Sequence, residues 1–144
     1  MKALLDSSVL VASFYEDHEH HLPSLELLLR HKKRDACLAT HSFAEVYATL
    51  TAMPGAKRVT PAEAVLFLGS IRERLTAIAL DGDDYIQAAE LAAESGASSG
   101  GIYDAIIGQC YLKSRAEFLY TWNLKHFQKL KANIGKNVRS PPTI

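Results

Sequence analysis

The sequence predicts an α/β fold in which a mainly parallel sheet of four to five strands is covered by helices. The order of the elements along the chain predicts this fold. Short apolar runs that suit buried strands alternate along the chain with longer segments that suit helices. The 144 residues, 48% of them hydrophobic, show no internal repeat and no linker. We therefore expect residues 1–144 to form one domain.

The first ten residues supply the strand around which the other elements are arranged. Ala3–Leu5 predicts a buried strand, and Val9–Phe14 predicts the helix after it. Asp6 stands where the strand ends. Ligands of an open α/β sheet bind beyond the carboxyl ends of its strands, so Asp6 is expected at the binding edge.

The remaining elements are expected in alternation, with N-cap residues, prolines and basic last turns marking the helix ends. Further strands are predicted at 36–39, 75–80 and 117–121. Helices are predicted at 43–50, 61–74, 85–94, from 102 through 111, and from Pro23 into the basic run 30–34. Segments 16–21 and 95–101 are expected as loops, and 122–127 as a turn or short helix.

Charge and cysteine content narrow the function classes. The 16 basic and 16 acidic side chains cancel, which disfavours a nucleic-acid binder without excluding a local basic patch. Cys37 and Cys110 are expected as buried thiols of a reducing compartment. The sequence shows neither a signal peptide nor an apolar run long enough to cross a membrane, so we expect a cytoplasmic protein without a membrane partner.

Three acids occupy comparable places: Asp6 and Glu45 each follow a predicted strand, and Asp104 opens a helix. Each also has a structural interpretation. Asp6 could cap its helix, Glu45 could form a capping box with Ser42, and Asp104 could complement the helix dipole. The adjacent pair Gly100–Gly101, which would let backbone approach a ligand, favours a binding role for Asp104.

If the three carboxylates converge, their mutual repulsion calls for a divalent cation. Oxygen ligands select Mg²⁺ or Mn²⁺, and the chemistry that such a site supports is phosphodiester hydrolysis. Basic side chains could attract the phosphate backbone, although a solvated surface explains them equally well. The candidates are Lys57, Arg58, Lys125, Lys129 and Lys131.

Four segments together resemble a PIN domain, and more narrowly the VapC toxins of toxin–antitoxin pairs. They are Asp6–Val9, Thr40–Tyr47, Gly101–Ala105, and Tyr120–Asn123 with His126–Phe127. The resemblance implies a PIN-like three-layer α/β/α fold and an Mg²⁺- or Mn²⁺-dependent endoribonuclease that cuts RNA. It also implies a homodimer inhibited by a small VapB-type antitoxin.

The resemblance assigns roles residue by residue. Asp6 matches the first metal-binding acid, Glu45 the second acid, and Asp104 the third, also a ligand. Ser7 falls where the family often has a hydroxyl near the metal, and Thr121 matches a hydroxyl at the end of the fourth strand. Ser7 and Thr121 are therefore candidate substrate contacts.

One departure from the family pattern concerns the segment after Thr121, where many PIN domains place a fourth acid. Asn123 and His126 stand here instead. Asn123 is a catalytic candidate that could orient a water by hydrogen bonding. His126 could be a ligand, a phosphate contact or a surface residue. The missing acid makes a second metal doubtful and leaves open a non-catalytic PIN-like module that binds RNA or protein.

Other features have plainer expected roles. A phosphatase with its aspartate after the first strand would need a second acid where Ser8 stands. The cluster His18–His21 lacks the spacing of a helical zinc site and is expected as a solvated loop or a helix start. Trp122 and Tyr103 could stack on bases, but core packing is the expected role for both.

Overall fold

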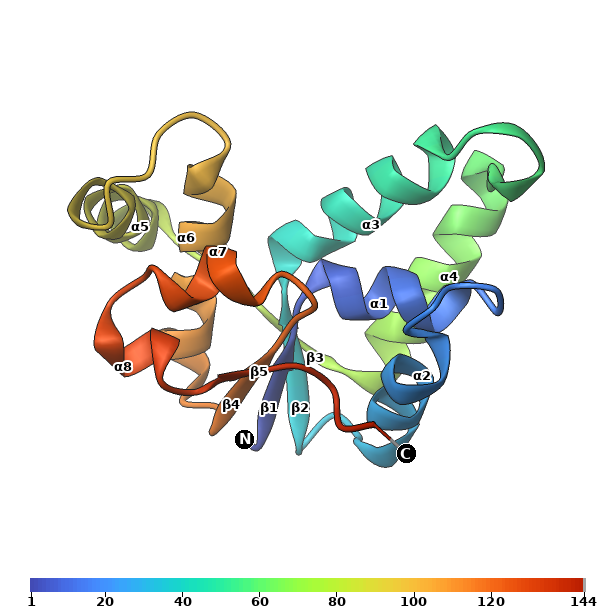
Figure 1. Ribbon diagram of the computed structural model, residues 1–144, viewed down its shortest axis with the longest axis horizontal. Helices are drawn as coiled ribbons and strands as arrows, with labels where there is room; N and C mark the ends of the chain where they lie inside the picture. Colours follow the sequence, from blue (N-terminus) through green and yellow to red (C-terminus); the bar gives the residue numbers. More distant parts are fainter. Residues whose placement is uncertain (144) are drawn as a thin grey trace.

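The computed structural model describes residues 1–143, which form a five-stranded, fully parallel sheet in the order β3-β2-β1-β4-β5. The first strand lies at the centre, and Leu4 pairs with Cys37 on one side and with Leu119 on the other (Figure 1). The strands are β1 (Ala3–Leu5), β2 (Ala36–Ala39), β3 (Thr76–Ile78), β4 (Phe118–Tyr120) and β5 (Val138–Arg139).

Helices cover both faces of the sheet, which confirms the predicted three-layer α/β/α architecture (Figure 1). One layer contains α1 (Ser7–Phe14), α2 (His21–Arg30), α3 (Thr40–Ala52) and α4 (Pro61–Arg74). The other contains α5 (Gly82–Glu94), α6 (Gly101–Ser114), α7 (Leu124–Gln128) and α8 (Ala132–Gly135). A short 3-10 helix, η1 (Gly55–Lys57), joins α3 to α4.

The alternation of side chains along each strand produces two cores. Leu4 and Leu119 point into the core shared with α5–α8. Ala3 and Leu5 point into the core shared with α1–α4. All four are fully buried. The sheet is therefore apolar on both faces, as expected for parallel strands covered on both sides.

Several element boundaries differ from the sequence prediction. The strand expected at 75–80 pairs only over Thr76–Ile78, and α2 begins at His21 within the segment expected as a loop. The edge strand β5 and helix α8 were not predicted. A two-residue strand has no pattern of its own, because its extended backbone is held by pairing with β4.

The expected capping box of Ser42 and Glu45 is wrong. Helix α3 begins at Thr40 with Ala39 as its N-cap, so β2 passes directly into the helix. Ser42 is fully buried inside the first turn, and Glu45 lies in the second turn. The capping boxes that do form are Thr60 with Glu63 and Asp81 with Asp84. Glu45 instead accepts a hydrogen bond from Ser7 of α1.

The two cysteines are free, buried thiols, as expected. Burial raises the pKa of Cys37 to about 11 and that of Cys110 to about 12, so neither is a reactive thiolate at neutral pH. Across residues 1–143, none of the helices combines the length and apolar character that crossing a bilayer requires.

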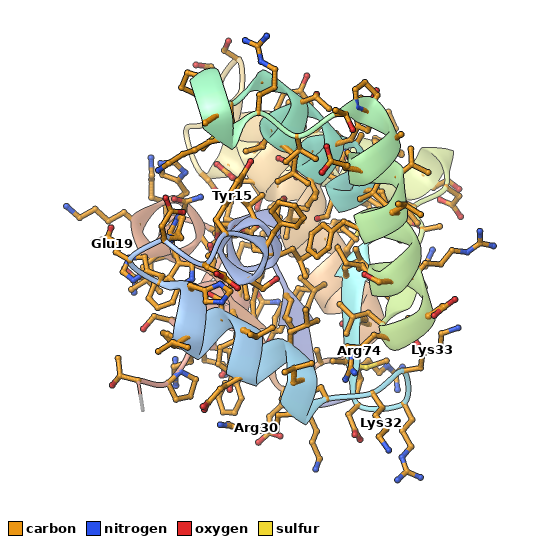
Figure 2. All side chains as sticks on the ribbon, turned by 90° about the vertical axis from the view of Figure 1, so that its right-hand side faces the viewer. Tyr15, Glu19, Arg30, Lys32, Lys33 and Arg74 are labelled. Atoms are coloured by element: carbon orange, nitrogen blue, oxygen red, sulfur yellow. The ribbon has the colours of Figure 1, made fainter. Side chains whose placement is uncertain are left out.

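The basic side chains of the α1–α2–α4 face gather away from the carboxyl ends of the strands. Figure 2 shows Arg30, Lys32, Lys33 and Arg74 together, apart from Glu19. Arg74 donates from Nη1 to the carbonyl oxygens of Leu29 and His31, at 3.3 and 3.2 Å. Arg74 therefore stabilises the C-terminus of α2, as the macrodipole favours.

Truncation of a buried leucine of β4, the strand beside central β1, tests the packing. Leu119→Ala should lower the free energy of unfolding by about 2–5 kcal/mol, because a fully buried leucine leaves a cavity. Leu66→Ala is the matched control, since Leu66 is 76% exposed and its loss should change stability by less than about 0.5 kcal/mol. Urea denaturation followed by circular dichroism measures both. Equal losses in the two variants would contradict this packing.

Candidate active site

A pocket of about 510 Å³ lies at the carboxyl edge of the sheet and is lined by all three predicted acids. Asp6 comes from the end of β1, Glu45 from α3 and Asp104 from the first turn of α6. Helix α6 begins at the same edge of the sheet, so Asp104 meets the two acids that follow strands. Asn123, in the turn after β4, also lines the pocket.

Asp6 is held by hydrogen bonds on one carboxylate oxygen. Its Oδ2 accepts from Ser8 Oγ at 2.8 Å, from Thr121 Oγ1 at 2.8 Å and, more weakly, from the backbone N–H of Ser8 at 3.4 Å. The contact with the Ser8 backbone makes Asp6 the N-cap of α1, as one interpretation predicted. The structural and the chemical interpretation of Asp6 are therefore compatible.

The other oxygen of Asp6 remains available. Within residues 1–143 no side-chain or backbone donor is bonded to Oδ1, and no fully buried side-chain oxygen there lacks a partner. Oδ1 therefore faces the pocket, although Asp6 as a whole is only 5% exposed. One oxygen positions the side chain, and the other can bind a ligand.

Thr121 is fully buried and holds the carboxylate of Asp6 in position. Its hydroxyl donates to Asp6 and accepts from the backbone N–H of Asn123 at 2.9 Å. Ser8 and Thr121 lie 3.2 Å apart, and both hydroxyl hydrogens point to Asp6. Thr121 thus has no hydroxyl hydrogen left for a substrate.

Glu45 is held by a hydroxyl as well. Ser7 Oγ donates to Glu45 Oε1 at 2.9 Å, and His41 Nε2 lies 4.0 Å from the same oxygen. Burial raises the pKa of Glu45 above its ordinary value of 4.5, and the charges of Asp6 and Asp104 raise it further, against the opposing effects of Ser7 and His41. Ser7 is itself buried, so it contacts an acid rather than open solvent.

The surroundings of Asp104 also disfavour its charged form. Burial raises the pKa of Asp104 above its ordinary value of 3.8, and Asp6 adds to the rise. His126 and Lys129 oppose it, and His126 Nδ1 lies 3.6 Å from Asp104 Oδ2. The charge of Asp6 contributes to the raised pKa of both Glu45 and Asp104, so the three carboxylates interact electrostatically across the pocket.

The donors fit a hard divalent cation in kind. They are carboxylates with mutual repulsion, and among residues 1–143 none of the three is ion-paired with a lysine or arginine. In that part of the chain, no three His, Cys, Asp or Glu side chains are grouped closely enough to hold a metal by themselves. The fit is therefore one of ligand chemistry: carboxylate oxygens suit an ion that keeps several waters and takes one or two carboxylates, as Mg²⁺ does.

The glycine pair before Asp104 has a packing role. A Cβ on Gly101 would come within 2.8 Å of the Ala97 Cβ, so α6 starts in contact with the preceding loop. Gly100 has nothing within 4 Å of such a Cβ. Gly101 therefore serves packing, Gly100 leaves open space beside the backbone, and the approach of a ligand to this pair stays a prediction.

Sequence reasoning missed part of the pocket wall. Ser8, His18, Glu19, His20 and Trp122 line it with the acids. Ser8 had a local signal, because a hydroxyl two residues after an aspartate suits an N-cap turn. His20 had none, since its position depends on contact with Trp122. Residues 18–21 form the end of a loop and the first residue of α2, as the loop or helix-start interpretation predicted, but His18, His20 and His21 are half-buried rather than solvated.

The raised pKa of Glu45 predicts how the stability of the protein depends on pH. Glu45→Gln should raise the free energy of unfolding at pH 7 in the presence of a chelator, because it removes a carboxylate whose pKa is raised in the fold. A carboxyl group whose pKa is raised in the folded protein contributes stability below its ordinary pKa of 4.5, and this contribution is lost as the pH rises. The difference in stability between Glu45→Gln and the wild type should therefore vanish near pH 4.5.

Glu63→Gln is the control of opposite sign. Thr60 lowers the pKa of Glu63 through two hydrogen bonds, so this variant should be less stable than the wild type at pH 7. Urea denaturation series from pH 4 to pH 8 measure both differences. A Glu45→Gln protein less stable than the wild type at pH 7 would show that burial and the neighbouring acids do not disfavour the ionised form of Glu45.

Comparison with known proteins gives the family. Residues 3–132 match the family model of the PIN domain. The chain is similar to the ribonuclease VapC40 of Mycobacterium tuberculosis, with 34% identity over 103 residues that cover 72% of this chain and 73% of that protein.

Solved structures share the fold. The VapC20 toxin of Mycobacterium tuberculosis, which cleaves the sarcin-ricin loop, matches with a TM-score of 0.70 and 16% identity over 87% of this chain and 92% of that one. A toxin–antitoxin complex from Klebsiella pneumoniae matches with a TM-score of 0.70 and 19% identity over 99% of this chain and 100% of that one. The fold, the family match and the relative agree, and the chain belongs to the PIN domain family, within its VapC group.

Proposed function

We propose that this protein is a metal-dependent endoribonuclease that acts as the toxin of a VapBC-type toxin–antitoxin system. The observation that carries the proposal is the convergence of Asp6, Glu45 and Asp104 on one pocket in a chain similar to a VapC ribonuclease. Residues 1–144 would act as one PIN domain.

The cation would be Mg²⁺ or Mn²⁺, held by Asp6 through Oδ1 and by Asp104, with Glu45 close by. When bound, it would neutralise a phosphate oxygen and favour ionisation of a water. The protein supplies a fixed position for Asp6, because Ser8 and Thr121 hold its other oxygen. Burial is the main cause of the raised pKa of Glu45 and of Asp104, and the cation would offset the repulsion among the acids that adds to it.

Glu45 is the best candidate to accept a proton from the attacking water. Its pKa is raised, which makes its carboxylate a stronger base than an ordinary glutamate. Oε1 is engaged by Ser7, so Oε2 is the oxygen that would take the proton. Asn123 is exposed at the pocket wall, where its amide would bind a water or a phosphate oxygen.

The basic residues that would attract RNA are those near α7. Lys125 and Lys129 are exposed, Lys129 is near enough to lower the pKa of Asp104, and His126 lies beside that acid. Lys57 and Lys131 are already paired, with Asp17 and Glu94 at 3.3 and 2.9 Å. The sequence did not distinguish these two groups of lysines.

The biological setting is proposed from the relatives. The structural neighbours include a VapBC complex of Haemophilus influenzae, matched with a TM-score of 0.66 and 14% identity over 97% of this chain and 98% of that one. We propose a small VapB-type antitoxin as the protein partner of this chain, a homodimer as its assembly and the cytoplasm as its place of action.

A second candidate function is a non-catalytic PIN-like module that binds RNA or protein. It is favoured by Asn123 and His126, which stand where many PIN domains have a fourth acid. The spacing of the three acids also favours it, because they form no closed ligand group within residues 1–143.

A cleavage assay separates the two functions. The wild type should cut RNA in Mg²⁺ or Mn²⁺ and stop in EDTA, and Asp104→Asn should lower the rate roughly a hundredfold or more by removing a ligand. Glu90→Gln, which changes an exposed acid of α5, should leave the rate unchanged. Titration calorimetry with Mn²⁺ alone should show weaker binding to Asp104→Asn. A wild type that cuts no RNA in either metal would refute the enzyme.

A growth assay tests the toxin role. Expression of the wild type should arrest bacterial growth, Asp104→Asn should not, and co-expression of the small reading frame beside the gene should restore growth. Arrest by both proteins alike would show that toxicity does not depend on cleavage.

A further inference from the structure

Two stacked aromatic pairs lie beside the three acids, and the residues of one of them, His20 and Trp122, line the acid pocket. The rings of His20 and Trp122 lie 3.7 Å apart between centroids and are inclined by only 7°. The rings of His41 and Tyr103 lie 5.1 Å apart and are inclined by 4°. One pair adjoins Asp6, and the other adjoins Glu45 and Asp104.

The His20–Trp122 pair is fixed relative to Asp6. The backbone N–H of Trp122 donates to Ser8 Oγ at 3.0 Å, the same hydroxyl that donates to Asp6. Trp122 Nε1 donates to Ser24 Oγ at 2.8 Å, which sets the ring orientation. The backbone N–H of His20 donates to His18 Nδ1 at 3.0 Å, and the His20 side chain is 36% exposed. An accessible ring thus rests on a rigid support beside Asp6.

The His41–Tyr103 pair stands at the other acids. His41 Nε2 is 4.0 Å from Glu45, and Tyr103 immediately precedes Asp104 on α6. Tyr103 is 49% exposed, so the core packing expected for it is wrong. Within residues 1–143 its hydroxyl has no hydrogen-bond partner. An exposed, unbonded tyrosine at a pocket of acids contributes little to folding and is available to a ligand.

We propose that the two pairs are platforms on which nucleobases of single-stranded RNA stack, one on each side of the phosphate that enters the pocket. This inference rests on the proposed function and defines its substrate class. Aromatic faces bind any base, whereas bases within a duplex are already stacked and inaccessible. The two pairs adjoin different acids, so bases stacked on them would hold the intervening phosphate between Asp6 and Asp104.

Equilibrium binding to two probes of equal length tests the platforms. One is fluorescein-labelled octaadenylate, and the other is an octamer with the same ribose–phosphate backbone and no bases. In EDTA, fluorescence anisotropy should show tighter binding of octaadenylate by the wild type. His20→Leu and Tyr103→Leu should each weaken octaadenylate binding roughly 5- to 100-fold and leave the abasic octamer unaffected.

Matched variants separate stacking from folding. His20→Phe and Tyr103→Phe retain an aromatic face and should keep the preference for octaadenylate. Tyr85→Leu removes a tyrosine of α5 that is 45% exposed and should have no effect. Double-stranded RNA of equal length should compete poorly. Equal binding of the two octamers by the wild type, or no binding of octaadenylate, would overturn the proposal.

Trp122 provides a direct spectroscopic signal, because it is the one tryptophan of the chain. Octaadenylate should change its emission in the wild type and in Tyr103→Leu, whereas the abasic octamer should not. These readouts are independent of cleavage. A wild type that cuts RNA but does not distinguish the octamers keeps the nuclease and loses the platforms. One that distinguishes them but cuts nothing keeps the platforms and loses the nuclease.

Discussion

The hydrogen bonds from Ser8 and Thr121 to one oxygen of Asp6 are the contact on which the site depends. They join the start of α1 to the end of β4, two segments 113 residues apart in the chain. Because neither hydroxyl has a second hydrogen, both are committed to Asp6. The carboxylate is thereby held in place, and its free oxygen is turned to the pocket.

The fold also explains why carboxylates repel one another in the pocket. The parallel sheet brings the carboxyl ends of β1 and β2 to one edge, and α6 begins there. Three acids are therefore gathered where burial and mutual repulsion raise the pKa of Glu45 and Asp104. A fold that concentrates negative charge in this way loses stability unless a cation is bound, and this links the proposed metal to the architecture.

The surroundings of the acids are organised through the same residues. Ser8 holds Asp6 and also accepts from the backbone of Trp122, whose ring supports His20. The hydroxyls that position the first acid therefore also position part of the proposed base-binding wall. The basic side chains at the ends of α2 and α4 lie apart from the pocket. The proposed contacts with RNA near the pocket are therefore the two aromatic pairs and the cations near α7.

The sequence by itself determined the layered α/β fold, since apolar strands alternating with capped helices allow few other arrangements. It also predicted that Asp6 and Glu45 meet, because residues that follow the strands of a parallel sheet lie at one edge. That α6 begins at the same edge and brings Asp104 to them was decided by the tertiary structure. Tertiary structure decided what surrounds them. The partner of Glu45 is Ser7 rather than Ser42, Tyr103 is exposed, and His20 rests on Trp122. These contacts join segments far apart in the chain, so no local pattern records them.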